Sequence, residues 1–111
     1  MREIAANYIY LPKAGLIKNA YISYCETGFW MLTDPGIGIR EIQGLEFYGG
    51  IIVAGYVKRF ASLFHDGAEL LSVLDEIYQN QGKQLEGLCI IEGADLVNLK
   101  WTASARIRVL C

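Results

Sequence analysis

The hydrophobic pattern of the chain repeats every two residues near both ends and follows a helical period between them. Over residues 104–109, apolar side chains at Ala105, Ile107 and Val109 alternate with polar ones, as in a half-buried β-strand. A stripe at helical spacing is formed by Leu70, Leu71, Leu74, Ile77 and Tyr78. A chain of 111 residues, 53% of them hydrophobic, has room for one core. We therefore expect a single domain, residues 1–111, that combines strands with a helical insert.

The expected elements divide the chain into three parts. Patterns typical of strands cover residues 4–10, 16–25, 29–32, 45–53, 88–91, 96–101 and 104–110. A helix is predicted over residues 68–81, with Asp66 as N-cap and Glu69 completing a capping box, and a shorter one over 58–64. The expected fold is mainly β (α+β), a β-sandwich of about seven strands, four before the helices and three after them. In order, the parts are N-terminal strands, helical insert and C-terminal strands, over residues 1–57, 58–82 and 83–111.

The strand patterns also predict which side chains share a face of the sheet. In the first strand these are Ile4, Ala6, Tyr8 and Tyr10. In the fourth strand they are Leu45, Phe47, Ile51 and Val53. Gly49-Gly50 interrupts this fourth strand, which indicates a β-bulge or a close approach of another backbone.

Composition and charge exclude several classes of partner. The apolar run Ile51–Ala54 is far too short for a membrane span, and Met1–Ile4 does not begin a signal peptide. The net charge is −2, and Arg106 and Arg108 are the only close pair of arginines, so nucleic-acid binding is not expected. We expect a cytoplasmic protein with no nucleic-acid or membrane partner. Its three cysteines are expected to be free thiols, at Cys25, Cys89 and Cys111.

The single histidine, His65, limits the chemistry that the chain can perform. A catalytic zinc usually needs three protein ligands, so one imidazole does not build a histidine-cluster site within one protomer. His65 and Asp66 could be read as a general base with an orienting carboxylate. Neighbouring residues at a helix start point in different directions, and Asp66 is better used as the cap. We therefore expect a surface or linker histidine, with no catalytic, metal-binding or cofactor-binding residue.

Two further features have a functional and a structural interpretation. A phosphate-binding interpretation of the loop Asp34–Gly38 requires that the loop open a helix, and here a plain turn is favoured. Gly49-Gly50 is likewise expected to form a sandwich corner. The aromatic residues could line a binding groove, although aromatics at strand positions more often pack in a core. They include Phe29, Trp30, Phe47 and Trp101, together with the tyrosines.

Two separated stretches resemble the small β-domain of amidohydrolases of the cytosine-deaminase and chlorohydrolase kind. Glu46–Val57, with the letters EFYGGIIVAGYV, is similar to the "GxxVxPGFV" run that leads from this domain into the catalytic barrel. The stretch 82–96 is similar to the "GKxADL" return from the barrel. The first two strands and the last resemble those of the same domain, over residues 4–10, 15–22 and 104–110. The resemblance implies a composite β-domain built from both ends of the chain.

The chain departs from this family where the metal site would be. Ala54 replaces the proline of the run, and the positions of the family's His-x-His metal pair fall at about Phe60 and Ser62. About twenty-five residues stand where the family has a whole barrel. The leading hypothesis is a non-catalytic domain that acts as an interaction or accessory module, as a homo-oligomer or with a separate protein subunit. The alternative is part of a metal-dependent hydrolase or deaminase whose active site is completed by another chain.

Overall fold

The structure, a computed structural model, describes residues 2–12, 14–24, 30–33, 44–80 and 86–110. Its seven strands are β1 (Arg2–Leu11), β2 (Gly15–Ile17), β3 (Tyr21–Tyr24), β4 (Trp30–Thr33), β5 (Glu46–Ala54), β6 (Leu88–Glu92) and β7 (Arg106–Val109). Between β5 and β6 lie a 3-10 helix, η2 (Val57–Leu63), and an α-helix, α1 (Leu70–Asn80). The prediction of a mainly β fold with about seven strands and a helical insert is confirmed. None of the helices in these ranges has the length and apolar character that crossing a membrane requires.

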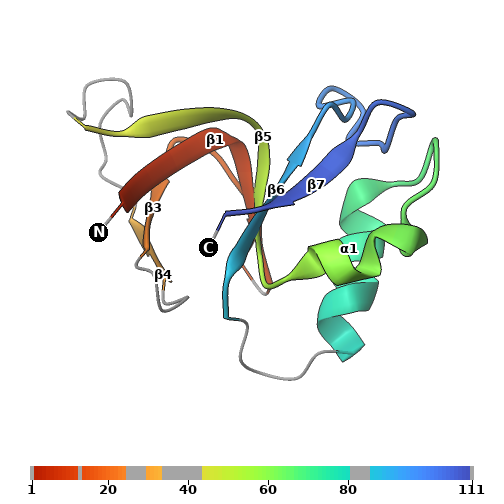
Figure 1. The fold of residues 1–111 in the computed structure, drawn as a ribbon, viewed down its shortest axis with the longest axis horizontal. Coiled ribbons are helices and arrows are strands. Elements are labelled where there is room, and N and C mark those ends of the chain that lie inside the picture. Colours follow the sequence, from red (N-terminus) through yellow and green to blue (C-terminus); the bar gives the residue numbers. More distant parts are fainter. Residues whose placement is uncertain (1, 13, 25–29, 34–43, 81–85, 111) are drawn as a thin grey trace.

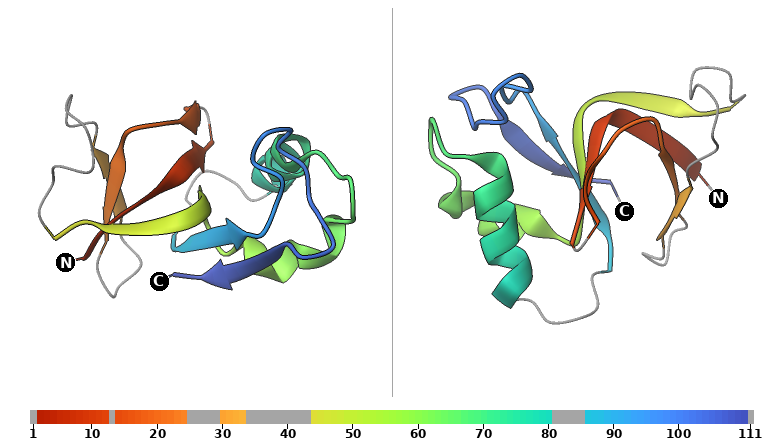
Figure 2. Two further views of the ribbon diagram at one scale, coloured as in Figure 1. Left: turned by 90° about the horizontal axis from the view of Figure 1, so that it is seen from above. Right: turned by 180° about the vertical axis from the view of Figure 1, so that it is seen from behind.

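The strands hydrogen-bond into one sheet in the order β4-β3-β1-β5-β6-β7, and β2 pairs with the end of β1. The central pair, β1 and β5, is parallel, whereas all other pairs are antiparallel. Both central strands are long and curved, so the sheet bends over itself (Figure 1). The two further views show β3 and β4 on one side of the bend and β6 and β7 on the other (Figure 2).

Each face of the bent sheet carries a separate hydrophobic core. The inner core lies within the bend and takes side chains from strands on both of its sides, so the sheet encloses this core as a sandwich does. Its fully buried members include Ile4, Ile22, Ile52, Leu88 and Ile90. The outer core lies between the second half of the sheet and the helices. Its fully buried members include Ile51, Val53, Leu70, Leu74 and Ile91.

The helix α1 forms because its apolar stripe covers the outer face of the sheet, and Leu74 at its centre is fully buried. The predicted N-cap, Asp66, is wrong. The carbonyl of Glu69 accepts the first intrahelical bond, from the Val73 amide, while the Leu70 amide donates to the carbonyl of Leu99 at 2.9 Å. A backbone partner from a distant turn therefore satisfies the helix start, a contact that local sequence does not reveal.

The distribution of strands around the helices differs from the prediction. Five strands precede the helices and two follow, because the predicted strand 16–25 is divided into β2 and β3 around Asn19, whose φ is 58°. The predicted strand 96–101 is a turn. The carboxylate of Asp95 accepts hydrogen bonds from the amides of Val97 and Asn98, at 2.9 and 3.1 Å, and so competes with extended backbone.

The predicted bulge at Gly49-Gly50 is confirmed. The pairing passes from Ala6 opposite Tyr48 to Tyr8 opposite Ile51, so β5 has one residue more than β1 at this point. The irregularity moves Tyr8 and Tyr10 to the outer core while Ile4 and Ala6 stay in the inner core, so the predicted common face of β1 is wrong. In β5, Phe47 was expected in a core, but it is 55% exposed.

Candidate functional site

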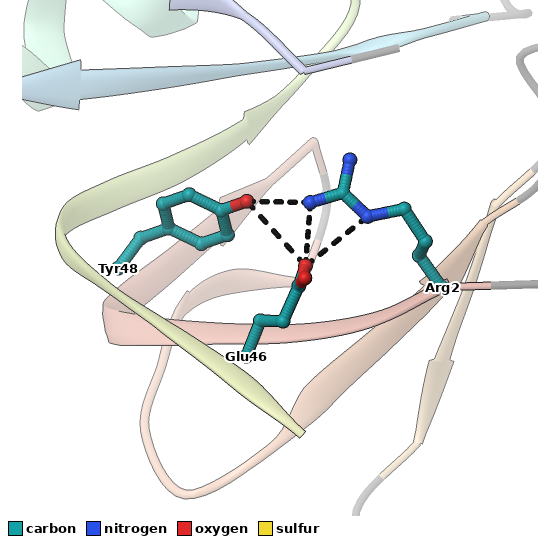
Figure 3. A network of polar contacts seen from close by, with 3 residues as sticks. All are labelled: Arg2, Glu46 and Tyr48. Carbon is teal, nitrogen blue, oxygen red and sulfur yellow. Dashed lines mark hydrogen bonds and ion pairs between the residues drawn. The ribbon is translucent and has the colours of Figure 1, made fainter. Parts of the chain in front are cut away.

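A cluster of polar side chains lies on the inner side of the bent sheet, where β1 and β5 begin. The Arg2 guanidinium donates to one carboxylate oxygen of Glu46 through Nε at 3.1 Å and through Nη2 at 2.5 Å. Nη2 also donates to the hydroxyl of Tyr48 at 2.7 Å. Figure 3 shows the three side chains converging, with the remaining guanidinium nitrogen directed away from both partners. Parallel pairing of β1 with β5 places Arg2 beside Glu46, although the two are far apart in sequence.

The cluster continues onto the last two strands. The Arg108 guanidinium lies over the Tyr48 ring, 5.6 Å from its centroid, and binds Glu92 through Nε at 3.0 Å and Nη2 at 3.2 Å. Arg106 approaches the same carboxylate at 3.6 Å. We call these six residues the rim cluster: Arg2, Glu46, Tyr48, Glu92, Arg106 and Arg108. Three guanidinium groups face two carboxylates, so the cluster carries one net positive charge in a chain of net charge −2.

The electrostatics of the rim cluster favour binding over proton transfer. The hydrogen bond to Glu46 raises the pKa of Arg2 above its ordinary value, so this guanidinium stays charged at any physiological pH. The Arg2 and Arg108 side chains are each 51% exposed, whereas the Glu92 side chain is only 19% exposed. The arginines therefore present fixed, charged N–H donors to solvent. Sequence analysis singled out Arg106 and Arg108 only as a basic pair and did not identify the cluster.

A second polar contact fastens α1 to the sheet. Tyr10, on β1, donates its hydroxyl proton to the carboxylate of Asp75 on α1. Its ring stacks on Tyr78, with centroids 6.3 Å apart, and Tyr78 donates to the carbonyl of Ala54 at 3.0 Å. Burial and then the bond to Asp75 raise the pKa of Tyr10 from 10.0 to about 12, and burial raises that of Tyr78. Two neutral phenols thus join the helix to the sheet.

We expect the stability of the fold to decrease as the pH rises from about 10 to about 12. Below pH 10 Tyr10 is protonated in both states; above it the unfolded chain loses this proton first, which favours unfolding. Urea unfolding at several pH values in this window measures the slope, with Tyr10→Phe as control. The unfolding free energy of Tyr10→Phe should be about 1 kcal/mol lower than that of the wild type at neutral pH, and it should decrease less steeply above pH 10. An identical slope in both proteins would contradict the assignment to Tyr10.

His65 lies where the sequence predicts it, on the surface between η2 and α1, and it is exposed. Its Nδ1 lies 3.4 Å from the carbonyl oxygen of Asp66, so the contact is with the backbone and not with the carboxylate. In the ranges that the structure describes, His, Cys, Asp and Glu side chains form no group of three or more suited to a metal ion.

Of the predictions for the cysteines and for the loop at 34–38, the structure describes only the one for Cys89. Cys89 is a free, buried thiol in the outer core, and burial raises its pKa, so it is poorly suited to act as a nucleophile. The predictions for Cys25, Cys111 and the loop Asp34–Gly38 lie outside the described residues.

Most aromatic side chains in the described ranges pack in the cores, as predicted. Phe64 and Trp101 stack with centroids 4.9 Å apart, and both contribute to the outer core. Tyr24 is buried in the inner core, against which Trp30 packs. Phe47 is exposed, as noted above, Tyr21 and Tyr56 belong to neither core, and Phe29 lies outside the described residues.

Comparison of the chain with protein-family models, with curated proteins and with solved structures gives no match. The resemblance to the small β-domain of amidohydrolases therefore stays a prediction from the sequence stretches quoted above.

Proposed function

We propose that the chain is a non-catalytic composite β-domain, related to the small domain of amidohydrolases, that acts as an interaction or accessory module. The supporting observation is the way in which the two ends of the chain combine. Strands β5 and β6, which flank the helical insert, are neighbours in the sheet, with Ala54 opposite Leu88. Immediately beyond them, the Gly55 amide donates to the carbonyl of Gly87 at 2.8 Å. The insert thus leaves and re-enters the sheet at one point.

The conformation at this point depends on a glycine. Gly87 has a φ of +84°, and a Cβ at this position would lie 2.3 Å from the ring of Tyr56. Only glycine fits such a close approach without displacing the aromatic ring. The helical insert therefore begins and ends at neighbouring backbone positions and packs back on the sheet, which supports a domain that can stand alone without a barrel between β5 and β6.

The interaction role is supported by exposed apolar side chains on the outer face of the sheet. Met31 on β4 and Phe47 on β5 are 63% and 55% exposed. Strand pairing places them on one face, because Met31 is opposite Ser23, Ser23 is opposite Glu3, and Ala5 is opposite Phe47. Ser23 and Ala5 between them are buried, so Met31 and Phe47 are two separate contact points on this face. The partner we propose for this face is a second copy of the chain, because isologous contacts are the commonest route to soluble oligomers.

Light scattering coupled to size-exclusion chromatography tests this function. The wild-type chain is expected to elute as a dimer, and Phe47→Asp to elute as a monomer, because a carboxylate at the contact would be desolvated. Val97→Asp is the matched control, since Val97 is 91% exposed in the turn before β7 and lies away from this face. A wild-type monomer would contradict the self-association.

The non-catalytic part of the proposal has its own test. The purified chain is assayed for hydrolysis and deamination of small amides and nucleobases with zinc or iron added. We expect no turnover. Turnover that a chelator abolishes and added metal restores would overturn the non-catalytic proposal.

A further inference from the structure

We propose that the rim cluster binds a phosphate group, which adds a ligand site to the domain independently of its self-association. The proposal rests on the arrangement of Arg2 and Arg108 around Tyr48. The hydroxyl of Tyr48 accepts from Arg2, and its ring lies under Arg108, so one residue brings the two guanidinium groups to the same place. These arginines come from opposite sides of the bend, one on β1 and one on β7.

Donors remain after the bonds within the cluster are made. A guanidinium has five N–H donors. In the part of the chain that the structure describes, the bonds from Arg2 to Glu46 and Tyr48 use Nε and Nη2, and Nη1 points away from both (Figure 3). Arg108 uses Nε and Nη2 toward Glu92, and Arg106 makes one contact at 3.6 Å. The Tyr48 hydroxyl accepts from Arg2 and donates to the Glu46 carboxylate at 3.5 Å, so the donors that remain for a ligand belong to the arginines.

The two glutamates orient these donors. Each carboxylate fixes the plane of an arginine before a ligand arrives, so less conformational entropy is lost on binding. The arginines still outnumber the carboxylates, and the remaining positive charge favours an anion. A tetrahedral phosphate has enough oxygens to accept from Nη1 of Arg2 and from the remaining N–H groups of Arg108 at once, and the planar guanidinium of arginine suits this geometry. The ligand chemistry is therefore a phosphate, free or esterified.

Titration of the ¹⁵N-labelled chain with inorganic phosphate, at constant ionic strength maintained with sodium chloride, tests the site. Amide resonances at the start of β1 and β5 and along β7 are expected to shift with a dissociation constant of about 1 mM. Arg2→Gln and Arg108→Gln should each weaken binding about 10-fold. Arg59→Gln should bind as the wild type does, because Arg59 also lies over a tyrosine ring, that of Tyr56, but outside the cluster.

The controls separate a specific site from general attraction of anions. Shifts that do not saturate, or an equal loss in Arg59→Gln and Arg108→Gln, would overturn the proposal. If Arg108→Gln does not fold, Arg108→Lys tests the site instead, because lysine keeps the positive charge but lacks the planar guanidinium group. Phosphate binding at the wild-type level in Arg108→Lys would overturn the site. A second titration, with O-phosphoserine, distinguishes the source: tighter binding than that of inorganic phosphate assigns the site to a phosphate ester, and equal binding to the free ion.

Discussion

The Gly50→Ala variant is expected to lose about 3 kcal/mol or more of unfolding free energy, a large fraction of the roughly 5–15 kcal/mol that stabilises an ordinary small domain. Gly50 is buried in β5 with a φ of +144°, which L side chains rarely adopt. A Cβ at this position would lie 2.2 Å from the carbonyl oxygen of Ile91, an atom of the neighbouring strand β6. Because the obstacle is backbone, the clash is relieved only if strands β5 and β6 separate.

The preceding residue provides a matched control for this prediction. Gly49 belongs to the same bulge but is exposed, and a Cβ there would meet no atom within 4 Å. Gly49→Ala should therefore stay within about 1 kcal/mol of the wild type, since it mainly reduces the conformational freedom of the unfolded chain. Urea denaturation of both variants, followed by circular dichroism, measures the difference. Equal midpoints for the two variants would show that the approach of Ile91 does not restrict position 50.

The second large effect is expected at the centre of α1. Leu74→Ala should lower the unfolding free energy by about 3 kcal/mol, because Leu74 is fully buried between the helix and the sheet and its truncation leaves a cavity. Leu71→Ala, on the edge of the same apolar stripe, should cost about 1 kcal/mol, since Leu71 is only partly buried. Alanine has a high helix propensity at both positions, so propensity does not explain a difference in unfolding free energy between the two variants.

Thermal or urea unfolding of the two leucine variants also tests whether the insert is an integral part of the domain. A large loss for Leu74→Ala in a single cooperative transition means that helix and sheet unfold together. Equal, small losses for both variants would indicate that α1 does not cover the outer core, and this part of the fold would then be incorrect.

Local patterns were sufficient to predict the helix, the bulge and the final strand. The stripe around Leu74 and the alternation around Ile107 each describe a single element packed on one core face. The errors have a different origin. The helix start depends on the carbonyl of Leu99, and the predicted strand at 96–101 yields to hydrogen bonds from the side chain of Asp95. The spacing of hydrophobic residues along the chain does not reveal which distant backbone group a helix start contacts, or where a side chain bonds to the backbone.

The rim cluster was not predictable because its members come from four different strands. Arg2 meets Glu46 only through the parallel pairing of β1 and β5, and Arg108 meets Tyr48 only because the sheet bends. Neither residue pair has a spacing that marks a motif. By contrast, the exposed position of His65 could be anticipated, since it required only the local preference for a connection between helices.

The parallel pairing of β1 with β5 has a consequence for the way in which the chain reaches its native state. A ribosome releases β1 well before β5, and the nascent strand then has one edge covered by the β2–β3 segment and the other without its permanent neighbour. Forming a contact between strands so far apart in sequence slows folding. It also prolongs the lifetime of an incomplete sheet with an unpaired edge and exposed apolar side chains. Synthesis in the cell therefore exposes this chain to aggregation until residue 54 has left the exit tunnel.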